Sequence, residues 1–288
     1  MNGSPVLTNL ELIRSLSRPI GPVPTGLTPI LPGLPGIRCV IFDIYGTLLA
    51  STGNEPGINN PPYRESTLRS LLRRHCIPAP AQPSSLTGQL DALIAREHEQ
   101  ARRAGTTFPE IEIRDLWSEL LQHPRDRNLE QLAIAYECMT NPVWPMAGAG
   151  ELLAALHKGG LVLGIISNAQ FYTPLLFPAL LKAELPALGF TETLCLFSYK
   201  LRTAKPGLAL YETMKDSLNG RGILPHEVLY LGNDVHKDIH PAAELGFRTA
   251  LFAGDLRSLR LHENNPTLHR PDAIVTDLAQ VTSLLPPD

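Results

Sequence analysis

The sequence predicts an α/β protein whose core is a doubly wound, Rossmann-like parallel sheet carrying an inserted all-helical cap. Short apolar runs alternate along the chain with segments of helical periodicity, and one long interval shows helical periodicity alone. The short runs are continuously apolar, which is typical of strands buried on both faces of a sheet. We therefore expect residues 37–51 and 146–288 to form the core and residues 52–145 to form the cap.

Six apolar runs have the length and composition of buried strands. They cover residues 37–42, 161–166, 193–197, 228–231, 248–252 and 273–275. Helical periodicity is found between them at residues 150–158, 208–218 and 240–245. Because parallel strands need a crossover connection, a helix between successive strands favours a parallel sheet.

In the interval between the first two predicted strands, apolar residues recur at three- and four-residue spacing, as on one face of a helix. Leu68, Leu71 and Leu72 show this spacing, and a further helix is expected over residues 129–139. The pattern continues through Leu86, Leu90, Leu93 and Ile94, and through Ile113, Leu116, Trp117, Leu120 and Leu121. Because no convincing strand pattern interrupts these segments, the cap is predicted to be all-helical.

The first 36 residues are predicted to form a proline-rich N-terminal extension. The chain has 27 prolines, nearly twice the usual share. Those between residues 19 and 35 prevent a helix and predict an extended linker. Residues 8–17, which precede the linker, have the pattern of a short amphipathic helix.

Composition excludes several classes of protein. Apolar residues make up 43% of the chain, so a large core is available, and the formal net charge is −3. No basic tract suggests a nucleic-acid partner, and no apolar run is long enough to cross a membrane. The cysteines lack the spacing of a metal site or a disulfide framework, which favours a reducing compartment; they are Cys39, Cys76, Cys138 and Cys195. We expect a cytoplasmic protein, monomeric or homodimeric, that acts on a small anionic molecule.

Polar residues follow three of the predicted strands directly. The first strand leads into Asp43, the second into Ser167 and Asn168, and the fourth into residues 232–238. Lys205-Pro206 lies between the last two of these segments. Ligands of open parallel sheets bind beyond the carboxyl ends of the strands, so these groups are expected to converge on one crevice.

The order and spacing of these segments resemble the haloacid dehalogenase superfamily of hydrolases. Its four motifs are matched by FDIYGTL at residues 42–48, ISN at 166–168, KP at 205–206 and GNDVHKD at 232–238. The resemblance covers the chain from about residue 37 to its end, and the helical interval lies where that superfamily has its helical cap. Four motifs in order, three of them directly after apolar strands, make the resemblance specific.

The resemblance implies a role for each motif residue. Asp43 would be the nucleophile that forms an aspartyl-phosphate, and Lys205 would offset the charge on the transferred group. Ser167 and the amide of Asn168 would hydrogen-bond that group, while Gly46 permits the turn of the first motif. Thr47, which can hydrogen-bond within the loop, is placed with the substrate-binding residues. The metal ligands would be Asp43, the carbonyl of Tyr45, Asp234 and Asp238.

The charges of these residues favour a bound metal ion on physical grounds. Asp43, Asp234 and Asp238 would place three carboxylates in one pocket, and like charges that close disfavour each other's ionisation. One Mg²⁺ and the Lys205 ammonium would together balance them. Mg²⁺ prefers oxygen ligands and usually takes one or two carboxylates plus substrate phosphate. Asp234 and Asp238 could instead cap the helix that follows them.

Tyr45 departs from the pattern of the phosphatases, which usually carry a second Asp at this position as general acid and base. A phenol can donate a proton but is a poor base at neutral pH. Tyrosine here resembles the 2-haloacid dehalogenases, which need no metal and lack the doubled acid of the fourth motif. That acidic pair favours a Mg²⁺-dependent phosphatase of a small phosphorylated metabolite. The alternatives are a 2-haloacid dehalogenase and a weakly active phosphate-binding regulatory protein.

Other polar residues are weaker candidates. His236 and His240 flank Asp238 and could suggest zinc, although surface roles are expected for both. Any of Arg64, Arg69 and Arg73 could place one cation over the pocket to bind the substrate, and the sequence does not choose among them. Residues 96–103 are interpreted as a solvated helix face and Trp117 as part of the core.

Overall fold

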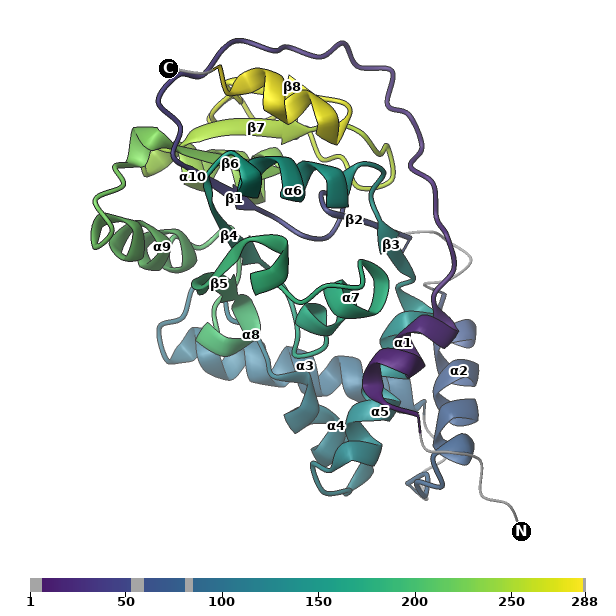
Figure 1. Cartoon of the computed structure of the whole chain (residues 1–288). Coiled ribbons are helices and arrows are strands. Elements are labelled where there is room, and N and C mark those ends of the chain that lie inside the picture. The colour runs from purple at the N-terminus through teal and green to yellow at the C-terminus, as the bar shows by residue number, and fades with distance from the viewer. Residues whose placement is uncertain (1–6, 53–59, 81–84, 287–288) are drawn as a thin grey trace.

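The computed structural model describes residues 7–52, 60–80 and 85–286. The first residues of the predicted extension and the segment 53–59 at the start of the predicted cap lie outside them. A parallel six-stranded sheet has the order β5-β4-β1-β6-β7-β8 (Figure 1). Its strands are β1 (Cys39–Phe42), β4 (Val162–Ser167), β5 (Phe190–Phe197), β6 (Val228–Gly232), β7 (Arg248–Phe252) and β8 (Ala273–Val275). The predicted parallel α/β core is confirmed.

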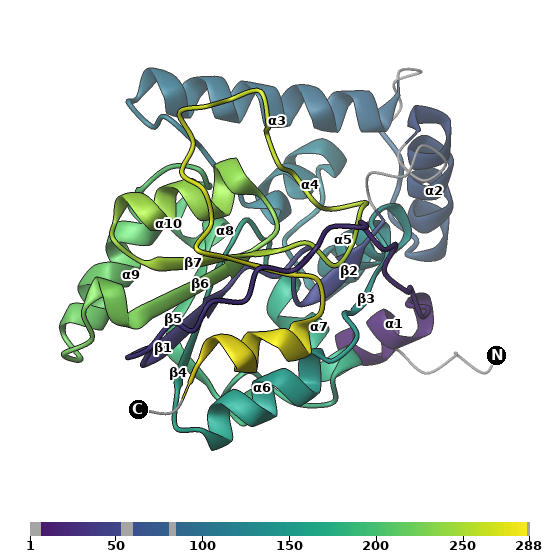
Figure 2. The ribbon, with the colours of Figure 1, turned by 90° about the horizontal axis from the view of Figure 1, so that it is seen from above.

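Helices cover both faces of the sheet (Figure 2). α6 (Ala149–Lys158), α7 (Thr173–Leu180) and η4 (Leu278–Leu284) lie on one face, and α9 (Ala209–Asn219) and α10 (His240–Glu244) lie on the other. Along β1, Val40 and Phe42 join the core on the α6 side, whereas Cys39 and Ile41 join the core on the α9 side. Because successive side chains of a strand point to opposite faces, burial of both faces makes the strand apolar throughout.

The remaining short elements connect the strands. They are η1 (Pro186–Leu188), α8 (Ser198–Leu201), η2 (Pro225–Glu227) and η3 (Val235–Ile239). η3 is one wide helical turn that is separated from β6 by two residues and contains the end of the fourth motif. It therefore carries site residues on an element held by the central strands.

The interval predicted as a cap contains helices in the part that the structure describes. They are α2 (Pro61–Arg74), α3 (Leu86–Arg103), α4 (Ile113–Leu121) and α5 (Arg127–Thr140). The side chains of Asn60, Ser85 and Asp126 each accept a hydrogen bond from a first-turn amide and so fix where three of the helices begin. We call this segment the helical insert.

Two short strands that the sequence did not predict join the helical insert to the core. β2 (Leu49–Ser51) and β3 (Val143–Pro145) pair antiparallel, with Leu49 opposite Pro145. Three residues are too few for a periodicity signal, so only the pairing reveals these strands. They place both crossings between core and insert side by side.

The N-terminal segment is packed onto the molecule. α1 (Asn9–Leu16) begins with a capping box between Thr8 and Glu11 and packs against α5 and α7, where its Leu12 and Ile13 are buried. The linker then continues without helix to the sheet, where Ile30 pairs antiparallel with Ile274 beside β8 (Figure 1). The predicted helix and extended linker are thus present, and the structure adds that both are docked.

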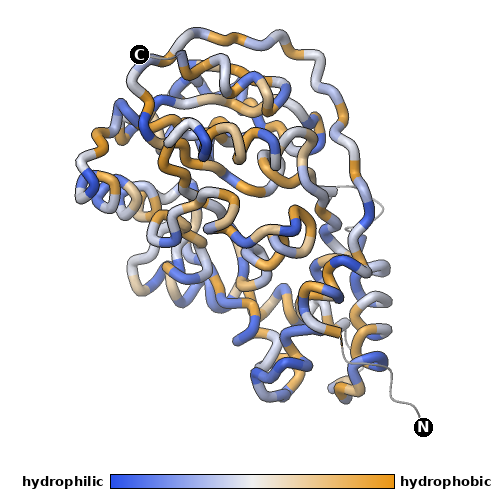
Figure 3. The backbone as a smooth tube through the Cα atoms, viewed as in Figure 1, coloured by the Kyte–Doolittle hydropathy of each residue, from blue (hydrophilic) through white to orange (hydrophobic). Residues whose placement is uncertain are grey.

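Apolar residues concentrate along the strands of the sheet, whereas the outer helices carry polar residues on the side away from it (Figure 3). Within residues 7–52, 60–80 and 85–286, no helix has the length and hydrophobicity needed to cross a membrane. Buried apolar residues fill the core between the layers and the inside of the helical insert.

Candidate active site

A cavity of about 210 Å³ lies at the carboxyl ends of the central strands. Of the residues predicted for the site, it is lined by Asp43, Tyr45, Asn168, Lys205, Asp234 and Asp238. The other lining residues are Gly46, Ser51, Asn233, Lys237, Ser258 and Arg260. The motifs therefore converge on one crevice, as the predicted topology required.

Asp43 follows β1 and is 5% exposed. Its Oδ1 accepts hydrogen bonds from the Ser167 hydroxyl at 3.0 Å and from the Lys205 ammonium at 2.6 Å. No donor in the described part of the chain bonds its other oxygen. One oxygen is thus held in place while the other is left for a reaction or a ligand.

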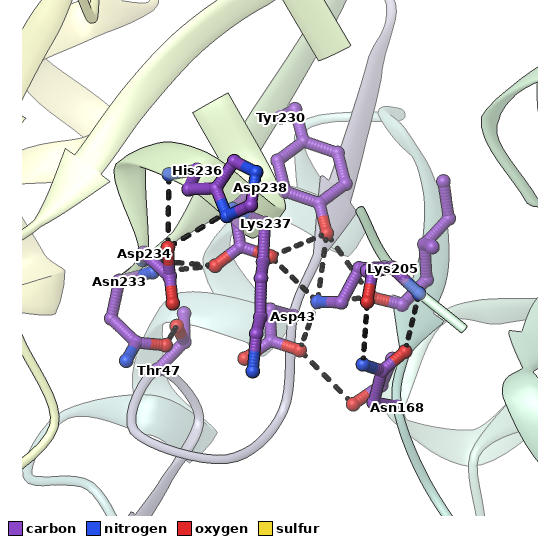
Figure 4. Close-up of polar contacts among 12 residues, drawn as sticks. Asp43, Thr47, Asn168, Lys205, Tyr230, Asn233, Asp234, His236, Lys237 and Asp238 are labelled. Atoms are coloured by element: carbon purple, nitrogen blue, oxygen red, sulfur yellow. Dashed lines mark hydrogen bonds and ion pairs between the residues drawn. The ribbon is translucent and has the colours of Figure 1, made fainter. Parts of the chain in front are cut away.

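Lys205 lies between two carboxylates (Figure 4). Its Nζ is 2.6 Å from Asp43 Oδ1 and 2.6 Å from Asp238 Oδ1. Burial alone would lower the pKa of Lys205, but Asp238 and Asp43 outweigh it, so the pKa is raised and the ammonium stays charged. Asn168 holds the Lys205 backbone from both sides, accepting from its amide at 2.8 Å and donating to its carbonyl at 3.1 Å.

Asp238 is held on all sides by the protein. Its Oδ2 accepts from the amides of Asn233 and Asp234, and its Oδ1 accepts from Lys205 and from the Tyr230 hydroxyl. Burial raises its pKa to about 6 against the opposing effect of Lys205, so it is ionised at neutral pH. Gly232 makes this possible, since a Cβ there would lie 2.5 Å from the Asp238 side chain. These contacts favour a role in positioning Lys205, and metal ligation by Asp238 stays a prediction.

Asp234 is the N-cap of η3, so the capping alternative and the site assignment apply to the same residue. Its Oδ1 accepts from the amides of His236 and Lys237 at 2.9 and 3.0 Å and contacts His262 Nε2 at 3.0 Å. Its Oδ2 has no donor among the described residues. Capping of η3 therefore uses Oδ1 of Asp234 and leaves Oδ2 available to bind a metal ion.

The donor set fits a magnesium ion better than zinc. Among the residues that the structure describes, no group of three or more His, Cys, Asp or Glu side chains is arranged to hold a metal. Within the described part of the chain, Asp43 and Asp234 each have one carboxylate oxygen that no protein donor contacts, and both residues line the cavity. Two carboxylates completed by waters and substrate phosphate are the usual protein contribution to a Mg²⁺ site.

Two predicted substrate-binding residues lie behind the cavity wall. Thr47 is fully buried and donates to Asn233 Oδ1 at 3.1 Å, so it links the first and fourth motifs and faces no substrate in this structure. Ser167 is also fully buried and donates to Asp43. Gly46 has φ +85°, and a Cβ at this residue would lie 2.5 Å from Ser258. The first-motif loop is thus packed tightly enough to require glycine.

Tyr45 lines the cavity, and its hydroxyl lies 2.9 Å from the hydroxyl of Thr173 at the start of α7. Burial and then the nearby Glu137 raise the pKa of Tyr45 far above its ordinary value, although Thr173 lowers it. The phenol therefore stays protonated and cannot act as a general base at neutral pH.

A second cavity, of about 470 Å³, lies where the helical insert meets the core. It shares Ser51 with the first cavity, so the two adjoin at the end of β2. Among the three candidate arginines, Arg64 lines the second cavity. Arg69 instead forms an ion pair with Glu65 at 2.7 Å, and Arg73 lines a surface depression elsewhere on α2. Of the three arginines, Arg64 is therefore the one that lines a cavity adjoining the first.

Several residues of the two cavities were not found from the sequence. Lys237 lies inside the fourth motif, and only its position among the motif residues indicated that it could line the site. Ser258 and Arg260 come from the loop after β7, and Glu137 comes from the last turn of α5 in the helical insert. Neither segment carries a motif, so only the tertiary structure brings these residues to the site.

No protein-family model matches the chain. A curated relative, the N-acetylmuramic acid 6-phosphate phosphatase of Pseudomonas aeruginosa, is 25% identical over 262 residues, which cover 86% of this chain and 95% of the relative.

Two solved structures share the fold. A haloacid dehalogenase superfamily phosphatase of Thermococcus onnurineus has a TM-score of 0.52 at 16% identity, and it covers 86% of this chain and 97% of its own. A 2-haloacid dehalogenase of Pseudomonas syringae has a TM-score of 0.51 at 19% identity, with the same coverage of 86% and 97%. The predicted fold is confirmed, and these structures show that a phosphatase and a dehalogenase share it.

Proposed function

We propose that this chain, which has the fold and the four motifs of the haloacid dehalogenase superfamily of hydrolases, is a Mg²⁺-dependent phosphatase of a small phosphorylated metabolite. The observation that carries the proposal is the placement of one buried ammonium, that of Lys205, between the carboxylates of Asp43 and Asp238. Asp234 adds a third carboxylate to the same cavity.

The charge of this buried cluster supports a divalent cation. Three carboxylates and one ammonium leave a net charge of −3 + 1 = −2, which one Mg²⁺ balances. Lys237 and Arg260 also line the cavity, but Lys237 is exposed and Arg260 is half-exposed, so solvent screens both. These two cations are placed to attract an anionic substrate to the mouth of the cavity.

The geometry supports Asp43 as the nucleophile. Ser167 and Lys205 hold Oδ1, which leaves the other oxygen to attack phosphorus as the bond from phosphorus to the leaving oxygen breaks. Lys205 also offsets negative charge on the transferred phosphoryl group. Before the substrate binds, the free oxygens of Asp43 and Asp234 would hold Mg²⁺. During the attack by Asp43, Asp234, waters and the substrate phosphate would hold it, and the ion would neutralise charge on the phosphate and orient it. Water then hydrolyses the aspartyl-phosphate.

The curated relative supports the phosphate ester as the substrate class. Its name describes a phosphatase of a sugar phosphate, and the similarity extends over most of both chains. The acidic pair of the fourth motif supports the same class, because a haloacid carboxylate would be repelled by the buried cluster. At an effective dielectric of about 20, such repulsion is worth several kcal/mol over about 4 Å.

A 2-haloacid dehalogenase is the second candidate, and the presence of Tyr45 favours it. The phenol is held by Thr173 and supplies no base, which suits a reaction whose halide leaving group needs no proton. Asp43 would then attack carbon, and the rim cations Lys237 and Arg260 would hold the substrate carboxylate.

A parallel screen of phosphate esters and 2-haloacids, each with and without Mg²⁺, tests the proposal. We expect phosphate release from a generic aryl phosphate that depends on added Mg²⁺ and disappears in Asp43→Asn. Halide release without Mg²⁺ would instead establish the dehalogenase. Binding of Mg²⁺ and phosphate without turnover of either substrate class would point to a regulatory protein.

A further inference from the structure

The second cavity is lined by two chemically different sets of side chains. One set is apolar and comes from α3, α4 and α5; it consists of Leu90, Ile94, Ile113, Trp117 and Ala133. The other set is polar and contains Ser51, Arg64, Glu137, Asn141 and Gln170. A volume of about 470 Å³ is within the range of small-molecule sites. Apolar walls with a few placed polar groups are typical of such sites.

Most polar groups of this cavity are already used by the protein. Gln170 accepts from the Ile113 amide and donates to the Ile111 carbonyl. Ser51 donates to Asn141 Oδ1 at 2.6 Å, and Asn141 Nδ2 donates to Glu137 Oε1 at 2.9 Å. These bonds fix the orientation of the Glu137 carboxylate at the wall.

Arg64 and Glu137 both line the cavity, but they differ in whether an ion-pair partner neutralises them. Arg64 forms a two-point ion pair with Asp91, with contacts of 2.9 and 3.2 Å, and also donates to the Tyr136 hydroxyl at 3.1 Å. Glu137 has no ion-pair partner in the described part of the chain. Burial raises its pKa, whereas Asn141 and Tyr172 lower it. The Arg64 charge is therefore neutralised, and the cavity retains the acceptor capacity of Glu137.

We propose that the second cavity binds the leaving group of the substrate and that this group is an uncharged ring rich in hydroxyl or amide N–H donors, such as an N-acetylated hexosamine. The C–H face of such a ring packs on the apolar set, and its donors bind Glu137. The remaining N–H groups of Arg64 hydrogen-bond ring oxygens. The inference rests on the proposed phosphatase activity, since the phosphate of the same ester would lie in the first cavity.

The charge balance distinguishes this ring from a carboxylated one. A carboxylate in the cavity would face Glu137, while the cation nearest to it is already paired with Asp91. Specificity of this kind depends on rejecting the wrong group as well as on binding the right one. The chain is therefore expected to discriminate against an acidic sugar phosphate, although its curated relative is a phosphatase of one by name.

The test compares three phosphate esters on the intact protein with Mg²⁺. N-acetylglucosamine 6-phosphate has the uncharged ring, N-acetylmuramic acid 6-phosphate adds a carboxylate to the same ring, and a generic aryl phosphate has neither. We expect kcat/KM for the uncharged sugar phosphate to exceed that for each of the others by at least about tenfold. Equal values for the three esters, or a preference for the acidic sugar, would overturn the inference.

Two variants test the residues. Glu137→Gln keeps the size of the side chain but replaces the carboxyl group by an amide, so it is expected to reduce the discrimination between the two sugar phosphates by about tenfold. Arg64→Met is expected to lower the ratio of kcat/KM for the uncharged sugar phosphate to that for the aryl phosphate. The matched controls are Glu130→Gln on the same helix, whose carboxylate pairs with Arg114, and Arg69→Met on α2. If the controls change these ratios as much as the cavity variants do, the inference is wrong.

Failure of the phosphatase proposal is distinguishable from failure of this inference. An aryl leaving group has no ring hydroxyl or amide donors for Glu137, so absence of aryl phosphate release contradicts the proposed function and not the specificity inferred here. In that case, calorimetric binding of the two sugar phosphates to the wild type and to Glu137→Gln still tests the second cavity. Tighter binding of the uncharged sugar, with the preference reduced in the variant, would support the inference; no binding of either would overturn it.

Discussion

The Tyr45 hydroxyl lies 2.9 Å from the hydroxyl of Thr173, a residue 128 positions later in the chain. This contact holds the phenol against the first turn of α7, and burial keeps it protonated. Tyr45 is thus fixed in a state in which it accepts no proton from water.

Replacing Tyr45 by Asp is expected to increase Mg²⁺-dependent phosphate release, because the carboxylate supplies a base for hydrolysis of the aspartyl-phosphate. General acid–base groups are typically worth about 10²–10⁴-fold, so even part of that gain is measurable as kcat with an aryl phosphate. Tyr45→Phe, which removes the Thr173 contact without adding a base, should not reproduce the gain. Loss of phosphate release in Tyr45→Asp, together with haloacid turnover by the parent protein, would favour the dehalogenase.

Replacing Asp234 by Asn is expected to weaken Mg²⁺ binding at least about tenfold, because it removes one of the two carboxylate oxygens left for a cation. Isothermal titration with MgCl₂ measures the affinity directly. The exposed Asp216 on α9 provides the control, since Asp216→Asn makes the same chemical change away from the cavity. Unchanged affinity in Asp234→Asn would remove this residue from the metal site.

Glu137 is expected to make the free energy of unfolding depend on pH. Its pKa is raised in the folded state by burial, so its contribution to stability is full below about pH 4.5 and is lost as the pH rises through the raised value. The Glu137→Gln variant has no group that ionises at this position, so it does not lose stability in this way as the pH rises. Its free energy of unfolding relative to the wild type should therefore increase between pH 4.5 and pH 8, as measured by urea denaturation.

An opposite sign is expected for Glu119→Gln. The ion pair with Arg96 lowers the pKa of Glu119, so its contribution is present above its ordinary pKa and is lost as the pH falls. This variant should lose stability relative to the wild type at the higher pH, by a small amount because the pair is exposed. The same pH course in both variants would contradict the assignment for Glu137.

The docking of α1 is expected to stabilise the whole molecule. Ile13 is fully buried between α5 and α7, and truncation of such a side chain to Ala typically costs about 2–5 kcal/mol. Ile13→Ala should lower the free energy of unfolding by an amount in this range, measured by chemical denaturation. Leu31→Ala is the control, because Leu31 belongs to the same N-terminal segment but is 39% exposed. Equal effects of the two substitutions would show that α1 is not docked in solution.

The sequence by itself determined the strands of the sheet and the residues that follow them. A strand buried on both faces must be apolar throughout, and a motif directly after it must lie at the carboxyl edge of the sheet. For this reason the pattern of the chain alone is enough to assign Asp43, Asn168 and Asp234 to one crevice. Both properties are local along the chain, so they can be found without knowing which segments meet.

Only the tertiary structure decided what each polar group does in the crevice. In the structure Asp238 forms an ion pair with Lys205, Thr47 points inward to Asn233, and Arg64 lines the second cavity. The tertiary structure also docked α1 and paired β2 with β3. Asp43 and Lys205, for example, are 162 residues apart. Hydrogen bonds and ion pairs of this kind depend on distance and direction in space, and no periodicity or spacing in the chain encodes them.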